Sequence, residues 1–108
     1  MQRVWRTVTG FYHVCARGTG KQLIFEGDDD RWEFLELMRE CCRKAGVTVI
    51  AWCLMGNHVL LVLADYEDAM SAAMHRLLLT YARRFNKRTG RTGHLFQNRF
   101  DRRSLDTD

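Results

Sequence analysis

The segment from His75 to Arg103 carries a strong concentration of positive charge. It contains nine lysine and arginine residues against a single acid, Asp101. A planar guanidinium can bridge two phosphate oxygens and stays charged, so an arginine-rich cluster is suited to phosphate recognition. A solvated charged surface without a ligand is the alternative interpretation. The basic residues are Arg76, Arg83, Arg84, Lys87, Arg88, Arg91, Arg99, Arg102 and Arg103.

Cysteine and histidine side chains are the candidate nucleophiles and metal ligands. The four cysteines form no C-x-x-C pair, and the sequence predicts reduced thiols that mostly fill the core. His58 stands beside a Gly-Asn turn, where a lone histidine can be either a hydrogen-bonded structural residue or a ligand. We interpret His13, His75 and His94 as structural or surface residues.

Aromatic residues offer no clear catalytic group. Tyr81 has a core-facing helical spacing that predicts a packed aromatic. Tyr12 falls within a predicted strand and Tyr66 in a predicted loop, and neither has a visible activating partner. Trp32 and Trp52 are predicted to pack in the core or on a sheet face, not to stack on nucleobases. We therefore name no catalytic residue.

The elements that must position these groups follow from the apolar periodicity. Asp28, Asp29 and Asp30 supply N-cap candidates for the first helix, and Gly46 supplies its stop. The predicted elements are a strand over 11–17, a helix over 29–45, strands over 47–55 and 58–64, a helix over 67–87 and a strand over 94–100.

This order of elements predicts an α+β class and a ferredoxin-like β-α-β-β-α-β fold, an antiparallel sheet with helices on one face. With 108 residues and a hydrophobic fraction of 46%, the chain is expected to form one domain over 1–108. It shows neither an apolar run long enough for a membrane span nor a secretory signal, so we expect a cytoplasmic, nucleoid-associated location without membrane contact.

Five local sequences, in this order and spacing, resemble the HUH-type single-tyrosine transposases, and in particular the REP-associated tyrosine transposases. Together they cover about residues 11–101. The matching stretches are Tyr12-His13-Val14 with Arg17-Gly18, Ile24-Phe25 before the aspartates, Ala51-Trp52-Cys53-Leu54-Met55-Gly56-Asn57-His58-Val59-Leu60-Leu61, Tyr81-Ala82-Arg83-Arg84-Phe85-Asn86, and Gly93-His94-Leu95-Phe96-Gln97-Asn98-Arg99-Phe100.

The resemblance implies a metal site built on a His-hydrophobic-His strand, whose two imidazoles project from one sheet face. Such a site would hold Mg²⁺ or Mn²⁺ and polarise the scissile phosphate. Here His58 occupies the first position and is the one candidate metal ligand. Leu60 occupies the second position and cannot ligate a metal.

The resemblance also implies a nucleophilic tyrosine on a helix after the last strand. Because the chain ends at Asp108, where that helix would begin, we expect the tyrosine to be absent. The hypothesis is therefore a domain that binds single-stranded or hairpin DNA, related to DNA transposition but inactive as this chain. The expected DNA-binding residues are Arg17, Arg83, Arg84, Lys87, Arg88, Arg91, Arg99, Arg102 and Arg103.

The sequence leaves two alternatives open. The first is an active nuclease in which another residue replaces the second histidine and Tyr81 or a partner chain supplies the nucleophile. The second is a structural remnant that binds nothing and forms a homodimer, for example by pairing an exposed strand over 58–64 with its copy.

Overall fold

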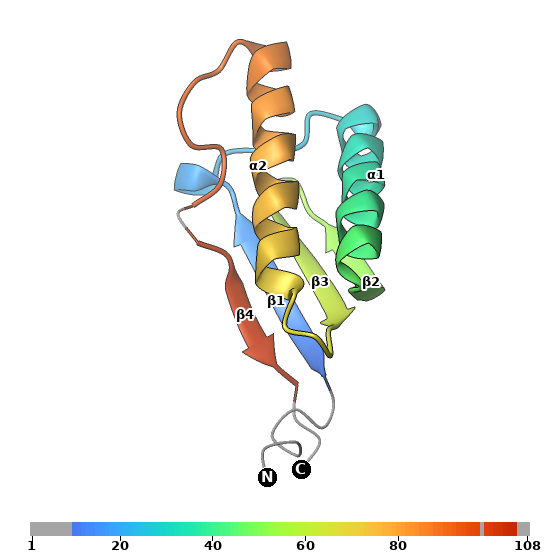
Figure 1. Ribbon diagram of the computed structural model, residues 1–108. Coiled ribbons are helices and arrows are strands. Elements are labelled where there is room, and N and C mark those ends of the chain that lie inside the picture. The colour runs from blue at the N-terminus through green and yellow to red at the C-terminus, as the bar shows by residue number, and fades with distance from the viewer. Residues whose placement is uncertain (1–9, 98, 106–108) are drawn as a thin grey trace, which may run out of the picture.

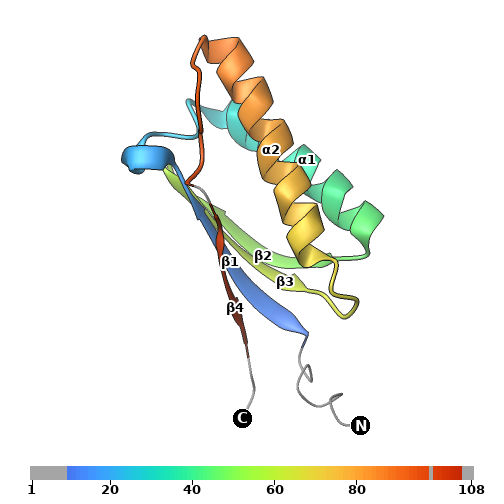
Figure 2. The same cartoon turned by 60° about the vertical axis from the view of Figure 1, so that its left-hand side comes forward.

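The computed structural model describes residues 10–97 and 99–105. Its elements are β1 (Phe11–Arg17), a short 3₁₀ helix (Thr19–Lys21), α1 (Asp28–Ala45), β2 (Thr48–Leu54), β3 (His58–Ala64), α2 (Met70–Thr89) and β4 (Asp101–Ser104). The strands form one antiparallel sheet in the order β2-β3-β1-β4. Both helices cover the same face of this sheet (Figures 1 and 2). The predicted α+β class and ferredoxin-like arrangement are confirmed.

The alternation of side chains along β3 separates a helix-covered face from an open face. Val59, Leu61 and Leu63 are buried in the core, whereas the residues between them, among them His58 and Leu60, are half-buried. Successive strand residues point to opposite faces, so His58 and Leu60 share the open face. The core lies between the sheet and the two helices.

A cluster of aromatic rings fills the end of the core where α1 begins and α2 ends. The ring of Tyr81 is fully buried, with its centroid 5.3 Å from that of Phe34 and 5.7 Å from that of Phe25. Its hydroxyl donates a hydrogen bond of 2.5 Å to the backbone carbonyl of Ile24. The prediction that Tyr81 is a packed aromatic is confirmed.

The predicted last strand over 94–100 is wrong. Leu95 and Phe96 are both buried, so consecutive side chains enter the core instead of alternating between two faces. Phe96 forms only an isolated bridge with Gly18, and regular pairing with β1 begins at Asp101. The apolar residues of this segment close one end of the core, and the exposed residues Asp101–Ser104 form β4.

The second helix begins three residues later than predicted. The buried carboxylate of Asp65 accepts backbone N–H hydrogen bonds from Glu67, Ala69 and Met70, with the last at 2.8 Å. These bonds hold residues 65–69 in a turn, and α2 starts at Met70. No helix within the described ranges has the length and apolar character that a membrane span requires.

The position of β3 contradicts one route to a dimer. β3 pairs with β2 on one side and with β1 on the other, so its backbone groups are already used within the sheet. The prediction of an exposed strand over 58–64 that pairs with a second copy is therefore wrong. In the described structure the edges of the sheet are β2 and β4.

Candidate nucleic-acid interface

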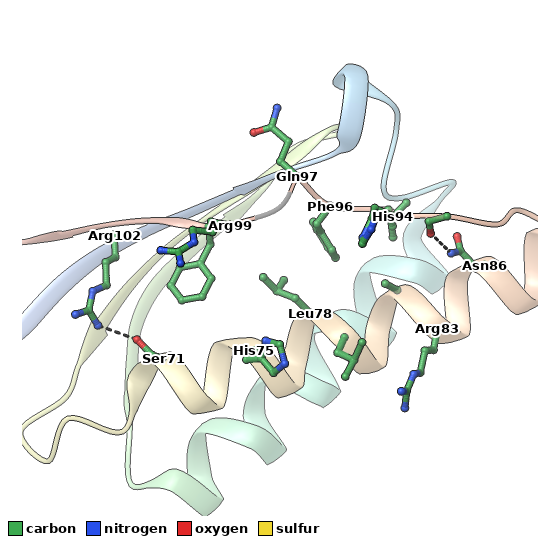
Figure 3. A pocket seen from close by; sticks show the side chains of 15 residues that line it. Ser71, His75, Leu78, Arg83, Asn86, His94, Phe96, Gln97, Arg99 and Arg102 are labelled. Carbon is green, nitrogen blue, oxygen red and sulfur yellow. Dashed lines mark hydrogen bonds between the residues drawn. The ribbon is translucent and has the colours of Figure 1, made fainter.

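A groove of about 710 Å³ lies between α2 and the segments 93–97 and 99–102 (Figure 3). Its described lining contains three arginines and two histidines but no aspartate or glutamate. Half-buried or buried aromatic rings form part of the wall. The charged and aromatic lining residues are His75, Arg83, His94, Phe96, Arg99, Phe100 and Arg102.

Two side-chain hydrogen bonds hold the walls of this groove together. Near the end of α2, the Asn86 side-chain amide donates to the backbone carbonyl of Gly93 at 2.9 Å. At the start of α2, Arg102 of β4 donates to the Ser71 hydroxyl at 2.9 Å, and its guanidinium also lies 5.7 Å from the centre of the Tyr12 ring. Both hydrogen bonds are visible in Figure 3.

The groove follows most of the length of α2. Its lining runs from Ser71 past Arg83 to Asn86, and the twelve residues from Ser71 to Arg83 rise about 18 Å along the helix. That length matches roughly five nucleotides of one DNA strand at about 3.4 Å each. The groove is therefore long enough to accommodate several consecutive phosphates.

Three of the nine predicted DNA-binding cations already have acidic partners. Arg17 pairs with Asp101 at 2.9 Å, and Arg84 pairs with Glu33 of α1 at 3.3 Å. Arg88 pairs with Asp30, which is almost fully buried, and with Glu26. The acids next to these three guanidiniums partly neutralise them and repel an approaching phosphate.

The other six predicted cations are exposed, and the described residues provide no ion pair for any of them. Arg83, Arg99 and Arg102 line the groove, and Lys87 follows Arg83 by one helical turn. Arg91 lies in the adjoining loop. Arg103 lies on the opposite face of the sheet from Arg102, because neighbouring strand residues alternate. The structure thus brings five of the nine cations together at or beside the groove.

The open face of the sheet carries the predicted metal position. The ring nitrogen Nδ1 of His58 lies 2.8 Å from the side-chain oxygen of Asn57. In the register of the sheet, His58 is opposite Arg17 of β1. Leu60 is opposite Cys15 of β1 and Cys53 of β2. Within the described ranges, no three His, Cys, Asp or Glu side chains gather in a way that could hold a metal ion. These residues do not fit the divalent metal site that the resemblance implies.

The candidate nucleophiles are mostly buried. Burial raises the pKa of the Tyr81 phenol well above its ordinary value, and nearby Asp30 adds to the effect. Burial likewise raises the pKa of the Cys42 thiol to about 11. Cys15 and Cys41 are also buried, which confirms the prediction that most thiols fill the core, whereas Cys53 is exposed. Tyr81 therefore has neither the accessibility nor the ionisation that a nucleophile needs.

The predicted core position of the tryptophans is wrong, whereas Trp52 does lie on a sheet face, level with the buried Leu61 of β3. Trp32 is 67% exposed and Trp52 is 53% exposed, so neither packs in the core. Both lie at the α1 and β2 side of the molecule, where they line a second groove. The apolar periodicity of the sequence correctly predicted the face of α1 that packs in the core. Trp32 lies outside this buried face.

The sequence predicts only structural or surface roles for two histidines that the structure places in the basic groove. His75 and His94 both line it, one from α2 and one from the following loop. His75 precedes Arg83 by eight residues, a spacing that places both on neighbouring parts of one helix face. His94 carries no such signal, because its position depends on the irregular path of residues 90–97.

Comparison with known proteins identifies similar sequences and folds. A family model described as "Transposase IS200 like" matches residues 7–108. The fold is similar to that of a REP-associated tyrosine transposase solved with a REP hairpin, with a TM-score of 0.70 and 12% identity over 93% of this chain. The matched part is 58% of that longer protein.

A second similar structure comes from Deinococcus radiodurans R1 and was assigned as a transposase. It matches with a TM-score of 0.71 and 16% identity, over 89% of this chain and 78% of that one. No curated protein sequence matches the chain.

Proposed function

The chain belongs to the IS200-like transposase family, and from this premise we propose that it binds single-stranded or hairpin DNA without cutting it. The observation that carries the proposal is the groove between α2 and residues 93–102, whose described lining holds three arginines, two histidines and no acid. A structure of similar fold contains a REP hairpin, which supports hairpin DNA as the ligand class.

Phosphate contacts from five cations provide the main binding energy in this proposal. They are Arg83, Lys87, Arg91, Arg99 and Arg102. Each phosphate contact releases condensed counterions, and five contacts correspond to a loss of affinity on the order of 10²- to 10³-fold between about 50 and 200 mM salt. The Phe100 ring, half-buried in the wall of the groove, provides an apolar surface beside the phosphates.

The absence of strand cleavage in this proposal has two physical reasons. Leu60 replaces one of the two imidazoles of the family site, and the residues around His58 do not complete a metal site. Tyr81 is buried and protonated, so it cannot attack a phosphodiester. We infer that this domain recognises DNA and that Tyr81 does not supply the nucleophile of any strand transfer by a protein containing it.

The test is binding of a labelled hairpin and of a matched unstructured strand at several salt concentrations, followed by a denaturing gel with Mg²⁺ or Mn²⁺. We expect salt-sensitive binding that prefers the hairpin, with no cleaved product. Affinity that hardly changes with salt would contradict the groove as the binding surface. A covalent protein–DNA adduct would contradict the proposed loss of chemistry.

A further inference from the structure

The second groove lies on the other side of the helix layer from the basic groove. It has a volume of about 670 Å³ and runs between α1 and β2, whereas the basic groove adjoins β4. β2 and β4 are opposite edges of the sheet, and Figure 1 shows α1 and β2 on one side and α2 and β4 on the other.

Two exposed indoles stand at one end of this second groove. Trp32 is 67% exposed on α1, and Trp52 is 53% exposed on β2. Because β2 runs back along α1 from its end, Trp52 lies about 13 Å along its strand from Thr48, toward the level of Trp32. The two rings make no ring contact with each other among the described aromatic pairs, and more than half of each side chain is exposed.

Two arginines and one glutamate, Glu36, line the remainder of the groove. Arg39 and Arg43 follow Trp32 by about 10 and 16 Å along α1. Arg39 pairs with Glu36 at 3.1 Å, whereas Arg43 is exposed and has no ion pair within the described ranges. Large exposed aromatic surfaces mark binding sites, and indoles beside guanidiniums provide both stacking faces and phosphate contacts.

The backbone of β2 disfavours a second copy of the chain as the occupant. The pairing of β2 with β3 shifts register between Val49 and Ala51, and Ile50 is 54% exposed at this irregularity. A bulge of this kind twists an edge strand away from regular pairing with an added strand. The groove is thus better suited to side-chain recognition than to extension of the sheet.

We propose that the groove between α1 and β2 binds unpaired bases of single-stranded DNA, which stack on Trp32 and Trp52 while Arg43 contacts a phosphate. This inference rests on the proposed DNA-binding function and adds a second contact to it. DNA held in the basic groove by its hairpin would extend an unpaired tail around the helix layer to this second site.

The test compares a blunt hairpin, the same hairpin with an unpaired thymidine tail, and one with an abasic tail. Stacking of one base corresponds to roughly a 5- to 100-fold change in affinity. Trp32→Ala and Trp52→Ala should each lower the affinity for the tailed hairpin within this range and leave the affinity for the blunt hairpin unchanged. Trp32→Phe and Trp52→Phe keep an aromatic ring, so they should lower the affinity for the tailed hairpin by less than the alanine variants do.

The abasic tail provides the second measurement. It keeps the phosphates but removes the stacking faces, so the parent protein should bind it less tightly than the thymidine tail. Equal binding of the two tails, or tailed-hairpin binding unaffected by the double substitution Trp32→Ala/Trp52→Ala, would overturn the inference. Loss of self-association in the double variant, with DNA binding unchanged, would also overturn it and assign the groove to a second copy.

Failure of the inference and failure of the proposed function give different results. If the blunt hairpin binds through Arg83 and Arg99 but the tryptophan variants behave like the parent, the proposed function stands and the inference falls. A different result is that the blunt hairpin does not bind, the hairpin with a thymidine tail does, and Trp32→Ala/Trp52→Ala weakens that binding. The proposed role of the basic groove then falls, and the stacking site stands.

Discussion

The Tyr81 hydroxyl is enclosed by the aromatic cluster and donates its hydrogen bond to the Ile24 carbonyl. Tyr81→Phe removes the donor and leaves that buried carbonyl without its partner, so we expect a loss of about 1–3 kcal/mol in the free energy of unfolding. Urea denaturation measures the change. DNA affinity in the same variant should match the parent. If the parent cleaves DNA and Tyr81→Phe abolishes this cleavage without a change in stability, Tyr81 is the nucleophile and the structural role is contradicted.

The position of Leu60 allows a direct gain-of-ligand experiment. Its side chain shares the open face with His58, two residues away on β3. Leu60→His should restore two imidazoles on one face and raise Mn²⁺ affinity by at least about tenfold, which corresponds to ~1.4 kcal/mol. Leu60→Ala is the matched control, because it removes the leucine without adding a ligand. Titration calorimetry that shows no gain in Leu60→His would mean that further ligands are also missing.

At the scale of elements, Asp65 determines where α2 begins. Its carboxylate accepts three backbone N–H hydrogen bonds at the turn before the helix. We expect Asp65→Ala to cost about 1–2 kcal/mol of stability and to increase hydrogen exchange in the first turn of α2. Asp65→Asn keeps an acceptor oxygen, so it should lose less stability than Asp65→Ala. Equal losses in the two variants would argue for the charge and not for the hydrogen bonds.

The elements with clear periodicity could be predicted from the sequence, and those shaped by tertiary contacts could not. Alternation along 58–64 and the apolar stripe of α1 reflect local geometry, and both elements lie where they were expected. Residues 94–100 carry the same apolar and aromatic residue types as a strand. Leu95 and Phe96 nevertheless fill the end of a core formed by distant residues, which no local pattern reveals.

The positive charge of the candidate site could be predicted from the sequence, but the spatial arrangement of its side chains could not. The concentration of arginine toward the end of the chain is a property of the sequence, whereas the pairing of Arg84 with Glu33 and of Arg88 with Asp30 depends on how α1 packs against α2. The exposure of Trp32 and Trp52 likewise depends on the gap between α1 and the sheet edge. Ion pairs between distant elements therefore determine which cations are free to bind phosphate and which already have an acidic partner.

For the whole molecule, the central claim is that the free cations of the basic groove bind DNA phosphates. The most direct test is the salt dependence of hairpin binding in two matched variants, each lacking two arginines. Arg83→Ala/Arg99→Ala removes groove cations, and Arg17→Ala/Arg84→Ala removes cations that are paired with Asp101 and Glu33.

The first variant should reduce the slope of log affinity against log salt by about 1.4 to 1.8, which corresponds to two lost phosphate contacts. The second variant should leave the slope nearly unchanged. A similar reduction in both variants, or in neither, would contradict the account.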